Sequence, residues 1–207
     1  ANQTITVIDT TKPVITPASD LTVECDGTGI CGGSSNTSAL NTWLANHGGA
    51  TASDTCSEVT WSHNYTNLSD LCGATGAATV TFTATDACGN FSTSIATFTI
   101  KDITKPIISA AINITVECDG NGNCGGISNN SALNIWLITN GGAIAIDACS
   151  WVTWSNNYTG LSDLCGATGA TTVTFKATDA CGNFSTSTAT FTIKDTTKPV
   201  MKAASNL

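Results

Sequence analysis

Ten cysteines are the residues of this 207-residue chain whose chemistry is most evident. Cysteines at short spacing either bind zinc or form disulfides. Zinc sites usually show Cys or His pairs only two to four residues apart, whereas the closest cysteines here are Cys25 and Cys31. His47 and His63 give way to asparagine in the repeat described below, so neither is a repeated ligand. We therefore predict disulfides, and with them an oxidising compartment outside the cytoplasm.

A repeat with a period of 93 residues organises the cysteines. The segment TKPVI at 11–15 returns as TKPII at 104–108 and as TKPVM at 197–201. Five cysteines recur at the same offset, with about three quarters of the aligned positions identical. We predict one module over 10–102 and a second over 103–195, flanked by the last strand of a preceding module (1–9) and the start of a following one (196–207). The chain therefore reads as an excerpt from a longer array.

Composition excludes several classes of function. The formal net charge is −8, only 11% of residues are charged, and all seven basic residues are lysine. A nucleic-acid surface needs a basic face, and no apolar stretch approaches the length of a membrane span. Catalysis needs a positioned nucleophile and base or paired carboxylates in a cleft, and no such constellation stands out. We expect a protein that is not an enzyme, binds no nucleic acid and has no membrane span in this segment.

Alternating sequence patterns predict a β-sandwich for each module. Residues 79–85 alternate Val80, Phe82 and Ala84 with threonines, and residues 94–100 alternate again after the turn at 86–90, which predicts a hairpin. Further strands are expected at 21–25, 50–53 and 59–65. Residues 38–48 are the exception, because their apolar residues share one helical face, Ser38 or Thr37 is suited to cap the start, and glycines follow. We predict an all-β fold of tandem immunoglobulin-like sandwiches, each with one short helix and internal disulfides.

These motifs resemble a known class of modules. The D-x-T-x-P start, TATDACGN at 83–90 and TFTI at 97–100 are similar to hyalin-repeat (HYR-like) immunoglobulin-like modules. TVECDG at 22–27, WL at 43–44 followed by GGA, and LSDLCGATG at 68–76 resemble the four-cysteine HYR-like repeats of SprB-type giant surface adhesins of gliding Bacteroidota. The resemblance implies an extracellular cell-surface fibre or adhesin exported by the type IX route. One departure is the segment around Cys31, which gives five cysteines per module in place of four.

An immunoglobulin-like topology leads to a disulfide scheme. The turns at 54–56 and 86–88 are expected at one end of the sandwich, which leaves two other cysteines at the opposite end. The predicted pairs are Cys56–Cys88 and Cys25–Cys72, repeated as Cys149–Cys181 and Cys118–Cys165. Cys31 and Cys124 are left over as thiols for a neighbouring chain. A local Cys25–Cys31 bridge is the rival scheme.

Two further sites follow from the comparison of the modules. The second module is more apolar, with Ile135, Ile138, Ile144, Ile146 and Trp151 where the first has Thr42, Ala45, Thr51, Ser53 and Glu58. We predict that this set forms an interface with another chain or module, the alternative being a repacked interior. Calcium is the one candidate cofactor, at the module junctions, because carboxylates from several segments suit a hard cation; the alternative is that Asp86 and Asp179 tighten hairpin turns and that lysines neutralise Asp102. The predicted ligands are Asp102, Asp147 and Asp179, with Asp9, Asp54 and Asp86 one junction earlier.

The leading functional hypothesis is a structural or adhesive array whose partners are neighbouring modules, other copies of the chain in a fibre, and surface glycans or other surfaces. The alternative is a carbohydrate-binding module that stacks sugars on its Trp and Tyr residues, although mid-strand positions such as Trp61 and Trp154 favour the core. Asp-Thr-x sequences at Asp9 and Asp195 are similar to an O-glycosylation signal of Bacteroidota. A linker turn capped by the aspartate is the competing interpretation.

Overall fold

The computed structural model describes residues 2–27, 36–119, 129–162, 164 and 166–203. The chain divides into two compact units, Ala1–Thr104 with Ala148–Trp151, and Lys105–Asp147 with Val152–Leu207. In the first unit the elements are β1 (Val14–Thr16), β2 (Leu21–Glu24), α1 (Thr37–Ala45), the single-turn helix η1 (His47–Gly49), β3 (Thr51–Ser53), β4 (Thr60–His63), β5 (Gly76–Thr85) and β6 (Phe91–Lys101).

The second unit repeats this order. Its elements are β7 (Ile107–Ile108), β8 (Ile114–Glu117), α2 (Asn130–Ile138), η2 (Asn140–Gly142), β9 (Ala145–Ile146), β10 (Thr153–Asn156), β11 (Gly169–Thr178) and β12 (Phe184–Lys194). Neither α-helix in the described part of the chain is long and apolar enough to cross a membrane.

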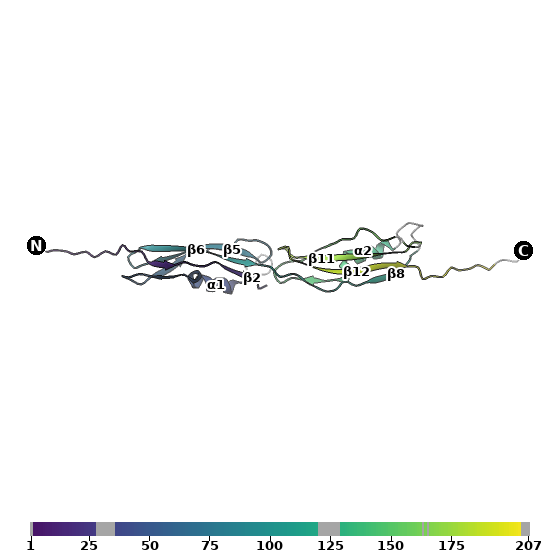
Figure 1. Cartoon of the computed structure of the whole chain (residues 1–207), viewed down its shortest axis with the longest axis horizontal. Coiled ribbons are helices and arrows are strands. Elements are labelled where there is room, and N and C mark those ends of the chain that lie inside the picture. The colour runs from purple at the N-terminus through teal and green to yellow at the C-terminus, as the bar shows by residue number, and fades with distance from the viewer. Residues whose placement is uncertain (1, 28–35, 120–128, 163, 165, 204–207) are drawn as a thin grey trace. The chain divides into compact units, whose positions relative to one another are not determined.

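Each unit is built on a long hairpin, β5–β6 in the first and β11–β12 in the second (Figure 1). The hairpin is the centre of a four-stranded sheet, ordered β2-β6-β5-β4 in the first unit and β8-β12-β11-β10 in the second. The strands β2 and β8 join it in parallel. A two-stranded sheet, β1-β3 or β7-β9, completes the sandwich. The predicted all-β, immunoglobulin-like fold and its central hairpin are therefore confirmed.

The core lies between the four-stranded sheet and the helix. Alternation along β5 buries Val80, Phe82 and Ala84 completely, because successive side chains of a strand point to opposite faces. Trp43 of α1 packs edge-on against Phe82, with ring centroids 5.2 Å apart. Burying such aromatic side chains contributes several kcal/mol each, so this cluster contributes strongly to the stability of the first unit. The second unit repeats it with counterpart residues.

The start of the helix differs from expectation. The N-cap is Asn36, whose φ of 57° is left-handed and whose side chain makes no capping hydrogen bond, so the predicted cap at Ser38 or Thr37 is wrong. The Asn36 side chain instead accepts a hydrogen bond from Asp26 N at 3.1 Å and donates one to Glu24 O at 2.8 Å. Asparagine tolerates the left-handed region, and these bonds tie the helix start to the end of β2.

Candidate functional site

A disulfide between Cys25 and Cys149 joins the two sequence repeats. Cys25 directly follows β2, and its backbone N–H donates to Lys101 O at 2.7 Å. Cys149 lies 124 residues further along the chain, with 6.1 Å between the two Cα atoms. Both cysteines are buried, at 7% and 3% exposure, in the core of the first unit. The bond therefore joins the residue that follows β2 in one repeat to a turn of the next repeat.

The turn that carries Cys149 is the segment Ala148–Trp151, and it packs on two glycines of the first unit. The backbone N–H of Ala74 donates to Cys149 O at 2.9 Å. A Cβ built on Gly73 would lie only 2.6 Å from that carbonyl oxygen, and one built on Gly27 would lie 3.1 Å from Ala148 O. Both glycines have positive φ, 59° and 71°, which other residues rarely adopt. Glycine is therefore required here for conformation and for close approach. We call this contact surface the docking site.

The predicted pairing of cysteines within one repeat is wrong. Cys25 bonds to Cys149, which excludes Cys25–Cys72, Cys149–Cys181 and the rival Cys25–Cys31. Cys56–Cys88 and Cys118–Cys165 are not formed either, because Cys56, Cys88 and Cys118 are free thiols. Cys72 and Cys181 are each disulfide-bonded, and Cys31, Cys124 and Cys165 lie outside the described residues. The physical reason is that the turn Ala148–Trp151, which belongs to the next sequence repeat, packs in the first unit and places Cys149 against Cys25.

The linker after the first repeat is tied down by one carboxylate. Glu24 Oε1, at the end of β2, accepts hydrogen bonds from Ile103 N at 3.0 Å and Thr104 Oγ1 at 2.7 Å. The bond from the Ile103 backbone, more than those from Thr104, holds the pKa of Glu24 below its ordinary value against the opposing effect of burial. Glu117 accepts the corresponding bonds from Thr196 and Thr197, and its pKa is lowered as well. We call this feature the glutamate clamp.

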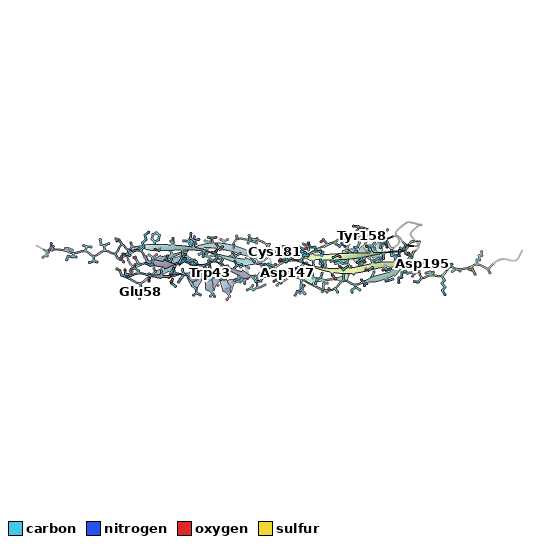
Figure 2. The ribbon with its side chains drawn as sticks, viewed as in Figure 1. Trp43, Glu58, Asp147, Tyr158, Cys181 and Asp195 are labelled. Carbon is cyan, nitrogen blue, oxygen red and sulfur yellow. A yellow bond between two sulfur atoms is a disulfide. The ribbon has the colours of Figure 1, made fainter. Side chains whose placement is uncertain are left out.

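The Asp-x-Thr sequences of the linkers form turns. In each, the aspartate Oδ1 accepts a hydrogen bond from the backbone N–H two residues later, at 2.9 Å for Asp9, 3.1 Å for Asp102 and 3.0 Å for Asp195. The capped-turn interpretation of these sequences is therefore confirmed. In Figure 2, Asp195 lies at the opposite end of the second unit from Asp147 and Cys181.

Two of the predicted calcium ligands meet at the start of the first unit. Asp9, Asp54 and Cys56 each bring one ligand atom within 4.8 Å of the others. The Oδ1 atom of Asp54 accepts from Cys56 N at 2.8 Å, while the Oδ2 atoms of Asp9 and Asp54 are buried without a hydrogen-bond partner. Buried carboxylate oxygens close to one another repel unless a cation or proton compensates them. Thiolate sulfur is a soft ligand, so a hard cation would use the two carboxylates.

The remaining predicted ligands differ between the units. Burial raises the pKa of Asp86, but hydrogen bonds from the Asn90 side chain and from the backbone of residues 88–90 outweigh it and lower that pKa. Both Asp86 oxygens bind Asn90 in this way, at 2.8 and 2.7 Å, and Asp86 is outside the cluster of Asp9 and Asp54. In the second unit, Asp147 and Asp179 bring carboxylate oxygens within 4.8 Å of one another.

The aromatic residues belong mainly to the core. Trp43 and Trp136 are 6% and 4% exposed, and their indole N–H groups donate to backbone carbonyls at 3.2 and 3.0 Å. Figure 2 shows Trp43 within the body of the first unit. Trp61 packs against that core and stacks on His47, with centroids 4.3 Å apart. Flat sugar-binding platforms are therefore not offered by these rings.

The five residues predicted to form an interface are all exposed. Their exposed fractions run from 59% for Ile135 to 77% for Ile138, so the alternative of a repacked interior does not hold for them. Ile144 and Ile146 line one shallow cavity of about 230 Å³, and Ile135 lines a second of about 420 Å³ beside α2. Trp151, by contrast, belongs to the first unit. The interface itself stays a prediction.

Comparison with known proteins identifies no family for this chain. No protein-family model and no curated protein matches the chain. Among solved structures, the protocadherin gammaB4 extracellular domain is 15% identical, with 88% of this chain and 32% of that chain covered at a TM-score of 0.31. Drosophila N-cadherin EC1-4 is 10% identical, with 89% and 50% covered and a TM-score of 0.33. Mouse cadherin-23 EC22-24 is 11% identical, with 88% and 67% covered and a TM-score of 0.31. The chain spans about a third to two thirds of these structures, and such likeness adds nothing to the fold already described.

Proposed function

We propose that this chain is part of an extracellular structural or adhesive array, in which successive repeats are fastened to one another to carry tension. The observation that carries the proposal is the disulfide between Cys25 and Cys149, which ties one repeat to the next. Disulfides persist in oxidising compartments outside the cytoplasm, which supports a cell-surface location. The glutamate clamp and the capped turns stiffen the short linkers in support of the same role.

Mechanical unfolding tests the tensile role. The two bonded cysteines are 124 residues apart in the sequence, and an extended chain spans about 3.5 Å per residue, so the bond withholds roughly 430 Å of contour length. Pulling the oxidised chain by its termini is therefore expected to release at least this much less than pulling the reduced chain. Equal contour lengths in the two states would contradict the proposal.

The finer form of the proposal is a fibre of the gliding-adhesin type, exported by the type IX route. It is supported by the sequence motifs shared with four-cysteine HYR-like repeats. Immunoelectron microscopy of cells that produce the protein is the direct test, with antibodies against the two-repeat chain. Label along surface filaments is the expected result, and label confined to the periplasm would contradict it. Beads coated with the chain should also adhere to surfaces or glycans more than beads coated with the reduced, unfolded chain.

Calcium is proposed as a stiffening ligand of the linker. The support is the pair of buried Oδ2 atoms of Asp9 and Asp54, which have no hydrogen-bond partner, and the preference of calcium for carboxylate oxygens. By the repeat, Asp102 and Asp147 are their counterparts, joined by Asp179. Isothermal titration of the chain with calcium, with Asp54→Asn as the control, tests this site. Equal heats from both proteins would contradict it.

A further inference from the structure

We propose that the bond between Cys25 and Cys149 recurs at every junction of the array, with Cys56 and Cys118 as its two open ends here. Cys118 then pairs with the cysteine of the following repeat that corresponds to Cys149. Cys56 pairs with the cysteine of the preceding repeat that corresponds to Cys25. This inference rests on the proposed function, because it requires further repeats on both sides.

The free thiols show which bonds are missing. All three free cysteines among the described residues, Cys56, Cys88 and Cys118, have counterparts 93 residues away that are bonded. Those counterparts are Cys149, Cys181 and Cys25 respectively. Position in the array, and not the local sequence, therefore separates bonded from free cysteines. Cys88 is accordingly expected to be bonded once a preceding repeat is present.

The second unit places Cys118 and Gly166 at the positions of Cys25 and Gly73 of the first. Cys118 is half-buried where Cys25 is buried. Gly166 has a φ of 64°, like Gly73 in the first unit, but a Cβ built on it would meet nothing within 4 Å. Gly166 therefore has the same left-handed conformation as Gly73, although no close contact in the described structure requires it there. The occupant that fits is a turn like Ala148–Trp151 from the following repeat.

The first unit presents the complementary turn. Asp54 Oδ1 accepts hydrogen bonds from Cys56 N at 2.8 Å and Ser57 N at 3.2 Å, which fixes the turn around the exposed Cys56. Figure 2 shows Glu58, two residues later, at the tip of the first unit. The Cys56 sulfur lies within 4.8 Å of a carboxylate oxygen of Asp9, at the end of the segment that resembles the last strand of a preceding repeat. In the proposed array, a preceding repeat would therefore lie beside this thiol.

The chemistry is an oxidation of two thiols. One S–S bond forms and two S–H bonds break, which releases two protons and two electrons. The electrons pass to the disulfide of an extracytoplasmic thiol–disulfide exchange catalyst, or to glutathione disulfide in a test tube, and that disulfide is reduced to two thiols. A thiolate of one repeat attacks the mixed disulfide formed on the other.

A lengthened chain tests the inference. In it, residues 1–195 are followed by a second copy of residues 103–195, which supplies Cys118 with a following repeat. After oxidation with glutathione disulfide, thiol alkylation and non-reducing peptide mapping should show the Cys118 peptide joined to a Cys149-type peptide. Cys56 should remain a thiol in the same molecule, as an internal control. In the original chain Cys118 should alkylate.

Several outcomes overturn the inference. One is that Cys118 in the second repeat of the lengthened chain stays reactive or bonds within its own repeat. The Cys25–Cys149 peptide shows in the same sample that the chain has folded correctly. The original chain gives a second measurement, because oxidation at high concentration should produce dimers joined through Cys56 and Cys118, which Cys56→Ser and Cys118→Ser each abolish. Dimers joined through identical cysteines would count against it. A lengthened chain that forms the bond but whose units unfold at the same force when oxidised and when reduced would refute the tensile function and leave this inference standing.

Discussion

Replacing Gly73 by alanine should weaken the Cys25–Cys149 bond selectively, and Gly166→Ala provides a matched control. The new Cβ at residue 73 would lie 2.6 Å from Cys149 O and 2.7 Å from Ser150 Cβ. Relieving such overlap costs about 2 kcal/mol. The left-handed φ adds about 1–2 kcal/mol of strain, but this strain is the same in the oxidised and reduced chains. The redox equilibrium therefore reports the overlap alone.

The assay is equilibration of the chain in glutathione redox buffer, followed by quantification of the Cys25–Cys149 peptide. A cost of about 2 kcal/mol corresponds to a roughly 30-fold lower effective concentration of the two thiols. Gly166→Ala carries the same backbone strain with nothing within 4 Å of its Cβ, so it should leave this equilibrium unchanged. If the two variants shift the equilibrium equally, or Gly73→Ala does not shift it, the reasoning about the docking site is refuted.

Three further perturbations address the linker, the cation and the histidine. Glu24→Gln should lower the free energy of unfolding by about 1 kcal/mol and flatten its dependence on acid pH. The pKa of Glu24 is lower in the folded than in the unfolded state, so its contribution is complete above the unfolded-state pKa and is lost as pH falls through the folded-state pKa. Urea unfolding between neutral and acid pH measures this, and an unaltered curve would exclude the glutamate clamp as a stabilising feature. Calcium at a hundredfold excess over Kd should stabilise the fold by about 2.7 kcal/mol, which is a rise in Tm of roughly 5–10 °C that a chelator reverses. Asp54→Asn should remove the part of this rise that comes from the site of Asp9 and Asp54, because the counterpart aspartates are unaltered in that variant. An unchanged Tm of the original chain would reject the cation. Burial, followed by the charge of His63, lowers the pKa of His47. The first unit should therefore lose stability as pH falls below the ordinary histidine pKa of 6.5, and His47→Asn should remove that dependence. Equal pH profiles of stability for the two proteins would contradict this expectation.

Local periodicity is sufficient to predict most of the fold. The alternation of Val80, Phe82 and Ala84 with threonines predicts β5 because a strand has a period of two residues. The glycines at 48 and 49 predict the end of the helix only approximately, because α1 already ends at Ala45 and the first residue after it with positive φ is His47. The helix start is missed because Asn36 uses its side chain on the end of β2 in place of the first turn, and that contact depends on tertiary structure.

The disulfide could not be predicted by the same means. Pairing depends on which surfaces meet, and the bonded cysteines are 124 residues apart. An internal pairing within each repeat satisfies the sequence equally well, so the repeat alone leaves the two schemes equivalent. The sequence does carry a weak indication of the contact at Cys25. Gly27 and Gly73 recur with the cysteines beside them, and a glycine beside a buried cysteine indicates that another backbone approaches closely. Asp9 and Asp54 do bring ligand atoms within 4.8 Å of one another, whereas Asp86, predicted to join them, gives its oxygens to Asn90 in the tight hairpin turn; the calcium site stays a prediction.

The position of Cys149 in the core of the first unit sets an order of folding for a chain that emerges from its N-terminus. The last strand of that unit, β6, ends at Lys101, yet the core is closed only by a turn that begins at Ala148. A unit that has just left a ribosome or an export channel therefore holds its hairpin and helix in place with Cys25 still uncovered. It becomes complete when nearly half of the next repeat has followed. In the proposed array, folding would then proceed as an overlapping series, in which the arrival of each repeat completes the unit before it.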